Sequence, residues 1–183
     1  MVEDEQSPDR LLVRLEGPVA YVRVEGRGSF RISPALKDFG LAALDQGARR
    51  LVLDFSACVG LDSTFMGVMA GLAFRYRKVE GGKICAINLS SKTHHLLSTL
   101  GLNRVVETRL AGKSIPEAGE SPAPEALQAA DLRARSPEEI TCTMIEAHED
   151  LIKTSTANLP KFKDVLVFLR EDLQRRSAEK RSP

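Results

Sequence analysis

The chain has 183 residues, with 26 basic and 25 acidic side chains and a formal net charge of +1 at pH 7. So balanced a charge argues against a protein that binds nucleic acid or an anionic membrane surface mainly by charge. The length fits one domain of common size, or a small domain with an appendage.

The first elements of the chain are predicted to be a hairpin and a helix. After a flexible tail over residues 1–10, alternating apolar and polar residues predict strands at 11–15 and 19–24. Ser33-Pro34 has the pattern of an N-cap followed by proline at the first helical position, and predicts a helix to about residue 45.

The middle of the chain alternates strands and helices. The apolar run at 50–56 contains one carboxylate, as expected of a central parallel strand, and helical spacing follows from Ser63 to Tyr76. Strands are predicted at 83–89 and 102–107, with a short helix capped by Ser90 or Ser91 between them. The order predicts an α/β fold with a mixed sheet of four to five strands, parallel after the hairpin. The helix from Ser63 carries small residues that permit close packing, namely Gly67, Ala70, Gly71 and Ala73.

The C-terminal third is predicted to be a helical extension. Residues 111–124 lose their periodicity and are predicted to be a linker, followed by the extension over 125–178 and a tail over 179–183. Within the extension, Ser136-Pro137-Glu138-Glu139 is a capping box that opens the first of two amphipathic helices, with a break near residues 158–160. Their apolar faces must pack on each other, on the preceding domain or on another molecule.

Asp62-Ser63-Thr64 stands where the buried strand at 50–56 leads into a helix. The amide groups of a helix N-terminus point outward and favour negative charge there. A phosphate on Ser63 would add about −1.5 to −2 charges that the fold tolerates, so its effect would fall on a docked partner. Asp62 can cap the helix in place of Ser63, although serine itself often has only that capping role.

These residues resemble the signature of the STAS domains, specifically of the bacterial anti-sigma factor antagonists. The match consists of Asp54 in the strand, Asp62-Ser63-Thr64 in the turn and Gly67 in the helix, while Phe65-Met66 replaces the usual Gly-Leu. The resemblance covers roughly residues 11–110 and implies a STAS-like mixed sheet, with the helical extension outside it. It also implies that Ser63 is the regulatory phosphorylation site and that Asp54, Asp62, Thr64 and Gly67 support it.

The resemblance implies a set of partners as well. Antagonists of this family bind an anti-sigma factor that is also a serine kinase of the histidine-kinase-like ATPase fold. Phosphorylation of the serine releases this kinase, and a metal-dependent serine phosphatase resets the switch. This chain would then be a substrate of both and not itself an enzyme. The residues expected to contact the partner are Arg27, Ser29, Arg31, Phe65 and Met66.

Other functions fit the same residues less well, and one stays open. A STAS scaffold that binds a protein or a small ligand without being phosphorylated is compatible with the Phe65-Met66 departure. A receiver-type phosphoacceptor aspartate would need an acidic pair after the first strand, where Glu16-Gly17-Pro18 stands. A serine hydrolase would need a Gly-x-Ser-x-Gly elbow, and Ser63 has no glycine on either side.

The remaining signals concern surroundings and assembly. The three cysteines are dispersed and lack Cys-x-x-Cys spacing, which is typical of reduced thiols, and the acidic N-terminus is unlike a signal peptide. No apolar run approaches the roughly 20 residues that span a bilayer. We therefore expect a cytoplasmic protein without a metal or other cofactor, and without nucleic acid or membrane among its partners. Two amphipathic helices after a linker also predict a homodimer through those helices.

Overall fold

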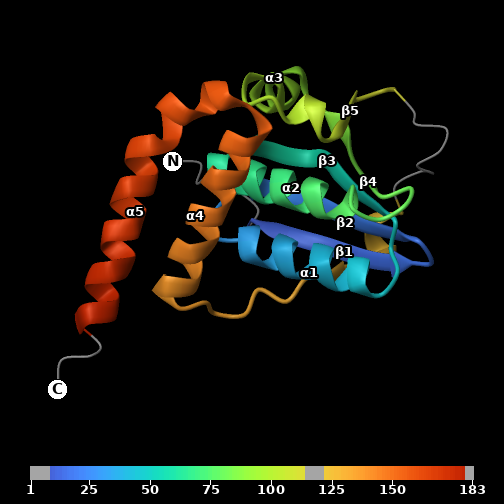
Figure 1. The fold of residues 1–183 in the computed structure, drawn as a ribbon. Helices are drawn as coiled ribbons and strands as arrows, with labels where there is room; N and C mark the ends of the chain where they lie inside the picture. The colour runs from blue at the N-terminus through green and yellow to red at the C-terminus, as the bar shows by residue number, and fades with distance from the viewer. Residues whose placement is uncertain (1–8, 114–121, 180–183) are drawn as a thin grey trace, which may run out of the picture.

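The computed structural model describes residues 9–113 and 122–179, which form one mixed sheet and a group of helices (Figure 1). The strands lie in the order β5-β4-β3-β2-β1-β6. β1 pairs antiparallel with β2 and with β6, and the pairs β2–β3, β3–β4 and β4–β5 are parallel. The strands are β1 (Arg10–Glu16), β2 (Val19–Gly28), β3 (Arg50–Leu61), β4 (Lys83–Leu89), β5 (Glu107–Leu110) and β6 (Gln128–Ala129).

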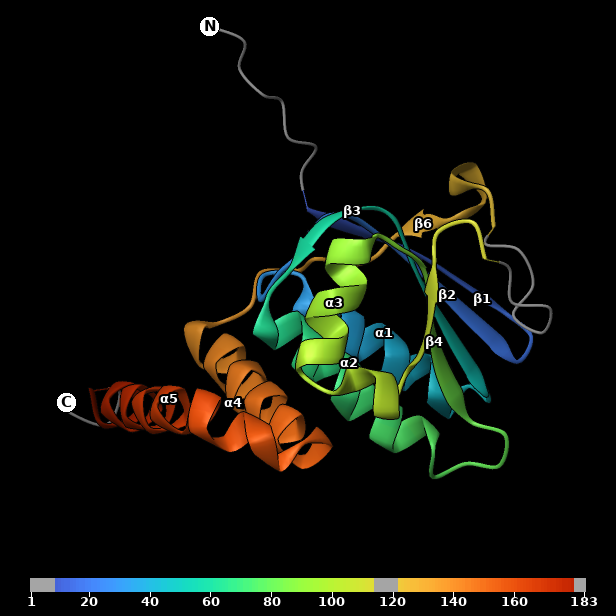
Figure 2. The ribbon, with the colours of Figure 1, turned by 90° about the horizontal axis from the view of Figure 1, so that it is seen from above.

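Three helices cover one face of this sheet, as Figure 2 shows from above. They are α1 (Ser33–Asp45), α2 (Ser63–Tyr76) and α3 (Ser91–Thr99). Alternate residues of β2, including Ala20, Val22 and Val24, face these helices and are almost completely buried. The central strands β3 and β4 add buried side chains to the same core, while Val52, Cys85 and Ile87 form a second buried cluster. Burial in both clusters explains the nearly continuous apolar sequences of these two strands.

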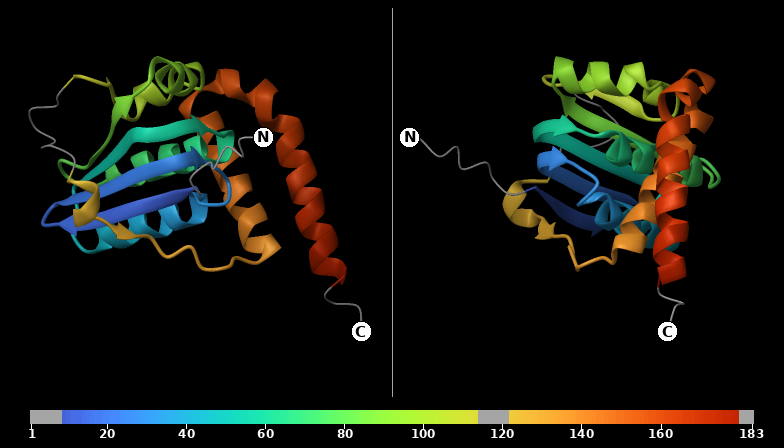
Figure 3. Two further views of the ribbon diagram at one scale, coloured as in Figure 1. Left: turned by 180° about the vertical axis from the view of Figure 1, so that it is seen from behind. Right: turned by 90° about the vertical axis from the view of Figure 1, so that its left-hand side faces the viewer.

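The helical extension folds back onto this layer of helices. Helix α4 (Pro137–Thr154) packs on α2, and α5 (Leu159–Glu179) packs on the outer side of α4 (Figures 1 and 3). The predicted capping box is present at Ser136, whose hydroxyl accepts a hydrogen bond from the Glu139 amide. The turn between the two helices is a short 3-10 segment at Thr156–Asn158, which confirms the predicted break.

Most of the predicted elements are confirmed, but three details were wrong. Residues 102–106 do not form the last strand: Leu102–Arg104 is a 3-10 turn after Gly101, whose φ is 77°, and β5 starts only at Glu107. Ser33 does not cap α1 but is its first residue, and its hydroxyl donates to the Ser29 carbonyl at 2.8 Å.

The sheet also has one strand more than predicted, because residues 128–129 pair with the outer edge of β1. Most of the predicted linker, residues 114–121, lies outside the described residues. None of the helices over 9–113 and 122–179 is both long enough and apolar enough to cross a bilayer.

Candidate functional site

The start of α2 is built around Asp62, which lies at the carboxyl end of β3. One carboxylate oxygen of Asp62 accepts a hydrogen bond from the Phe65 amide at 2.8 Å, which makes Asp62 the N-cap of the helix. Ser63 is therefore the first helical residue and is half-buried. Asp62 takes the capping role, as predicted, but the Ser63 hydroxyl is bonded within the protein rather than left free for a kinase.

Asp62 also holds the loop that follows β2 against the start of α2. Its second carboxylate oxygen accepts a hydrogen bond from the Phe30 amide at 2.7 Å. The structure thus brings the loop with Ser29 and Arg31 to the N-terminus of α2, as expected of residues that would contact one partner. Arg31 is exposed, and Ser29 is half-buried, with its hydroxyl 3.3 Å from a carboxylate oxygen of Asp9.

The predicted contact residue Arg27 lies at the end of β2 and is exposed. Its amide donates to the other carboxylate oxygen of Asp9, at 2.8 Å. Arg27 and Ser29 are thus bound to the same aspartate, which fixes this edge of the candidate surface.

Asp54 supports the site from within the sheet. It lies in β3 with only 3% of its surface exposed. Its carboxylate accepts a hydrogen bond from the Ser56 amide and another from the side-chain amide of Asn88, both at 2.9 Å. Asn88 adopts a positive φ of 56° at the end of β4. Asp54 therefore joins the middle of β3 to the carboxyl end of β4, upstream of the residues that lead to Ser63.

The partner of the Ser63 hydroxyl is His148 of α4, with 3.0 Å between Oγ and Nε2. The other ring nitrogen, Nδ1, lies 2.7 Å from the backbone carbonyl oxygen of Met144. A carbonyl oxygen can only accept, so Nδ1 carries a proton, and in the neutral ring Nε2 is an acceptor. The Ser63 hydroxyl therefore donates its hydrogen bond to His148.

His148 is held in this neutral form by its surroundings. Only 3% of its surface is exposed, and burial lowers its pKa, although the hydrogen bond to Met144 and the negative charge of Asp62 act in the opposite direction. The ring also packs on Phe162 of α5, with 4.9 Å between the ring centroids. One imidazole thus connects Ser63 with both helices of the extension.

The residues that follow Ser63 are buried. Thr64, Phe65 and Met66 are 3%, 0% and 4% exposed, so as placed here Phe65 and Met66 offer almost no surface to a partner. Gly67 faces the backbone of α4 so closely that a Cβ would collide with the carbonyl oxygen of Ala147. The absence of a side chain at Gly67 allows α4 to approach α2 this closely.

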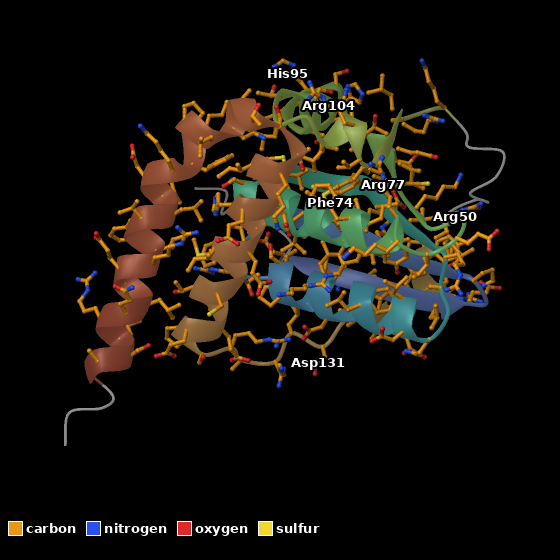
Figure 4. The ribbon with its side chains drawn as sticks, viewed as in Figure 1. Arg50, Phe74, Arg77, His95, Arg104 and Asp131 are labelled. Carbon is orange, nitrogen blue, oxygen red and sulfur yellow. The ribbon has the colours of Figure 1, made fainter. Side chains whose placement is uncertain are left out.

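Sequence reasoning missed His148. The signals in the sequence were the small residues Gly67 and Gly71, which indicated that something packs closely on α2, and the amphipathic pattern of residues 137–154. Nothing in the local pattern connected the two. The basic residue Arg50, at the start of β3, lies at the end of the sheet away from α4 (Figure 4).

Comparison with known proteins gives the fold a family. A family model described as "Mlab, STAS domain" matches residues 11–107 of the 183. No curated protein matches the chain. The match ends before α4 and α5, so the helices that cover Ser63 lie outside it.

Solved structures are also similar to part of the chain. A candidate anti-sigma factor antagonist from Thermotoga maritima is 20% identical, with a TM-score of 0.50 over 58% of this chain and 88% of that one. An anti-sigma factor antagonist from Mycobacterium paratuberculosis is 23% identical, with a TM-score of 0.49 over 61% of this chain and 91% of that one. The Thermotoga likeness agrees with the architecture described above, and the family match over more than half of the sequence decides the assignment: the chain belongs to the STAS domain family.

Proposed function

We propose that this protein is an anti-sigma factor antagonist that works by partner switching, with Ser63 as its phosphorylation site. In this proposal the unmodified protein binds an anti-sigma factor that is a serine kinase of the histidine-kinase-like ATPase fold. Phosphorylation releases the kinase, and a metal-dependent serine phosphatase restores the unmodified state. The protein itself is a substrate of both enzymes, located in the cytoplasm, and catalyses nothing.

The observation that carries this proposal is the division of roles between Asp62 and Ser63. Asp62 caps α2 and fixes the loop before α1, so the Ser63 hydroxyl is not required for either task. A phosphate at the first residue of a helix lies near the outward-pointing amides and the positive end of the dipole, which stabilises it by about 0.3–1 kcal/mol. Phosphorylation of Ser63 is therefore compatible with the folded STAS domain, and its effect falls on a partner docked at the start of α2.

The chemistry of the step requires only a hydroxyl and ATP. The bond between the γ-phosphorus and the bridging oxygen of ADP breaks, a bond from Ser63 Oγ to phosphorus forms, and the hydroxyl proton passes to a base of the kinase. The group added carries about −1.5 to −2 charges, and a charge buried without compensation costs a complex several kcal/mol. Arg27, Ser29 and Arg31 would form the rest of the surface that the partner contacts.

The experiment is incubation of the purified protein with ATP and candidate kinases of this fold, followed by phosphopeptide mass spectrometry. We expect one phosphate on Ser63, none in Ser63→Ala, and full labelling in the control Ser91→Ala, which changes an exposed serine outside this site. In a capture assay the phosphorylated protein should lose at least about a hundredfold in affinity for the kinase. Stoichiometric labelling at another residue would contradict the proposal.

A second candidate is a STAS scaffold that binds a protein or a small ligand without phosphorylation. The favouring observation is that the Ser63 hydroxyl is half-buried and already bonded to His148, while Phe65 and Met66 are buried. This function predicts no labelling of Ser63 by any such kinase, together with a partner whose binding is unaffected by Ser63→Ala.

A further inference from the structure

We infer that α4 is an intramolecular cover of the Ser63 surface, and that docking of α4 and phosphorylation of Ser63 exclude each other. The inference rests on the proposed function, since it takes Ser63 to be the residue that is phosphorylated. It adds a regulatory role for the α4–α5 hairpin (Pro137–Glu179), which lies outside the family match.

The space around the Ser63 hydroxyl is occupied by His148 of α4. The hydroxyl proton points at His148 Nε2, 3.0 Å from Oγ. Phosphorylation would put a phosphorus with three further oxygens in place of that proton. The imidazole occupies this space and is itself enclosed, with 3% of its surface exposed and Phe162 of α5 packed against the ring. A phosphate therefore cannot point toward His148 while α4 stays where it is.

Helix α4 cannot withdraw slightly from α2 to make room for a phosphate. Ala147, the residue before His148, has its backbone against Gly67 of α2 at a distance that excludes even a methyl group. Contact between two backbones cannot be relaxed by rotating a side chain. Packed interfaces tend to have discrete arrangements rather than to deform continuously. A phosphate too large for the space between the two helices therefore separates the whole of α4 from α2.

Electrostatic repulsion also disfavours a phosphate on Ser63 while α4 is docked. His148 accepts a hydrogen bond from Ser63 through a neutral ring, and Asp62 adds a negative charge beside it. A phosphate would bring two negative charges to this half-buried place. Protonated His148 could partly compensate them, but only if the ring gave up the position that it now fills. Ion pairs at the edge, such as Lys37 of α1 with Glu146 of α4, hold the closed state but do not reach Ser63.

Two consequences follow for the switch. Docking of α4 disfavours phosphorylation of Ser63 by the same free energy with which phosphorylation disfavours docking. A kinase that modifies Ser63 must therefore compete with α4. Once modified, the protein exposes the face of α2 around Gly67 and Gly71 and frees the α4–α5 hairpin. The phosphorylated protein would then differ from the unmodified one in its surface as well as in its charge.

The test uses full-length protein with phosphoserine incorporated at position 63 during synthesis, so that no kinase is needed. Hydrogen–deuterium exchange is measured over α4 and over the core strands β3 and β4. We expect the amides of α4 to exchange at least roughly tenfold faster than in the unmodified protein, with β3 and β4 unchanged. Exchange in α4 that is unchanged or slower would overturn the inference, because the phosphate would then have been accommodated beneath the helix.

A matched pair of glycine substitutions tests the same contact without phosphate. In Gly67→Ala the methyl group meets the Ala147 backbone, whereas in Gly71→Ala it meets only the movable carboxylate of Asp150. Gly67→Ala should speed exchange in α4 at least roughly tenfold relative to Gly71→Ala, again with β3 and β4 protected. Equal exchange in the two variants would overturn the proposed backbone contact.

Failure of this inference can be distinguished from failure of the proposed function. If α4 opens on phosphorylation but no kinase modifies Ser63, the cover exists and the partner-switching proposal fails. If a kinase modifies Ser63 and releases its partner while α4 stays protected, the switch exists and the cover does not.

Discussion

Asp62 and Ser63 are adjacent residues with different tasks at the start of α2. Asp62 receives hydrogen bonds from the amides of Phe30 and Phe65, and so joins the loop before α1 to the helix. Removing both bonds in Asp62→Ala should lower the free energy of unfolding by about 1–2 kcal/mol. Urea denaturation would measure the loss. Asp62→Asn, which can keep one acceptor oxygen, should lose less, and equal stability of all three proteins would contradict this role.

His148 makes the contact with Ser63 dependent on pH. Burial lowers its pKa in the folded protein, so the unfolded chain binds the proton more readily. The part of the free energy of unfolding that depends on neutral His148 is fully present above the pKa of this residue in the unfolded chain, about 6.5. It is lost as pH falls from that value through the pKa of His148 in the folded protein.

We therefore expect the urea midpoint to fall between pH 7.5 and pH 5.5, and to fall less in His148→Gln, which can still bond to Ser63 but does not titrate. The same fall in both proteins would show that another group is responsible.

At the scale of elements, the turn between α4 and α5 fixes the hairpin on the STAS domain. Asn158 is 1% exposed, and its side-chain amide donates to the carbonyl oxygens of Leu100 and Leu151. Asn158→Ala leaves both buried carbonyls without this donor and should cost about 2 kcal/mol. The exposed Asn103 provides a control, since Asn103→Ala should change the denaturation midpoint very little.

Local sequence predicted the elements whose signals are local. The Ser136 capping box and the Ser90 cap of α3 fall where the sequence placed them. Residues 102–106 were mistaken for a strand because their apolar side chains are buried around a turn, where hydrophobicity alone does not distinguish the two. The two-residue β6 is too short to show any period.

The contact between Ser63 and His148 could not be predicted in this way. The two residues are 85 positions apart, and an amphipathic helix specifies only that its apolar face must be buried. Whether α4 would cover its own domain, a second copy or another protein was left open by the sequence. The glycines of α2 favour a close neighbour, but a glycine does not identify the helix that approaches it.

At the scale of the whole molecule, the predicted homodimer stays a prediction, now limited to the outer face of α5. Packing of α4 on α2 buries much of the apolar surface that suggested self-association. Val167 and Phe168 of α5 remain 53% and 61% exposed. We expect light scattering to give twice the 20.0 kDa of one chain.

Phe168→Lys should return the mass of this dimer to that of one chain. Val59→Lys, at an exposed residue of β3, should not. A wild-type mass of one chain at all concentrations would contradict the prediction.

The order of Ser63 and α4 along the chain affects the protein while it is being made. Because His148 follows Ser63 by 85 residues, the ribosome releases the serine well before the helix that later packs over it. At about 5–20 residues per second, this interval lasts roughly 4–17 s. A nascent chain would therefore pass through a period in which Ser63 is accessible to a kinase whatever the fate of the finished protein.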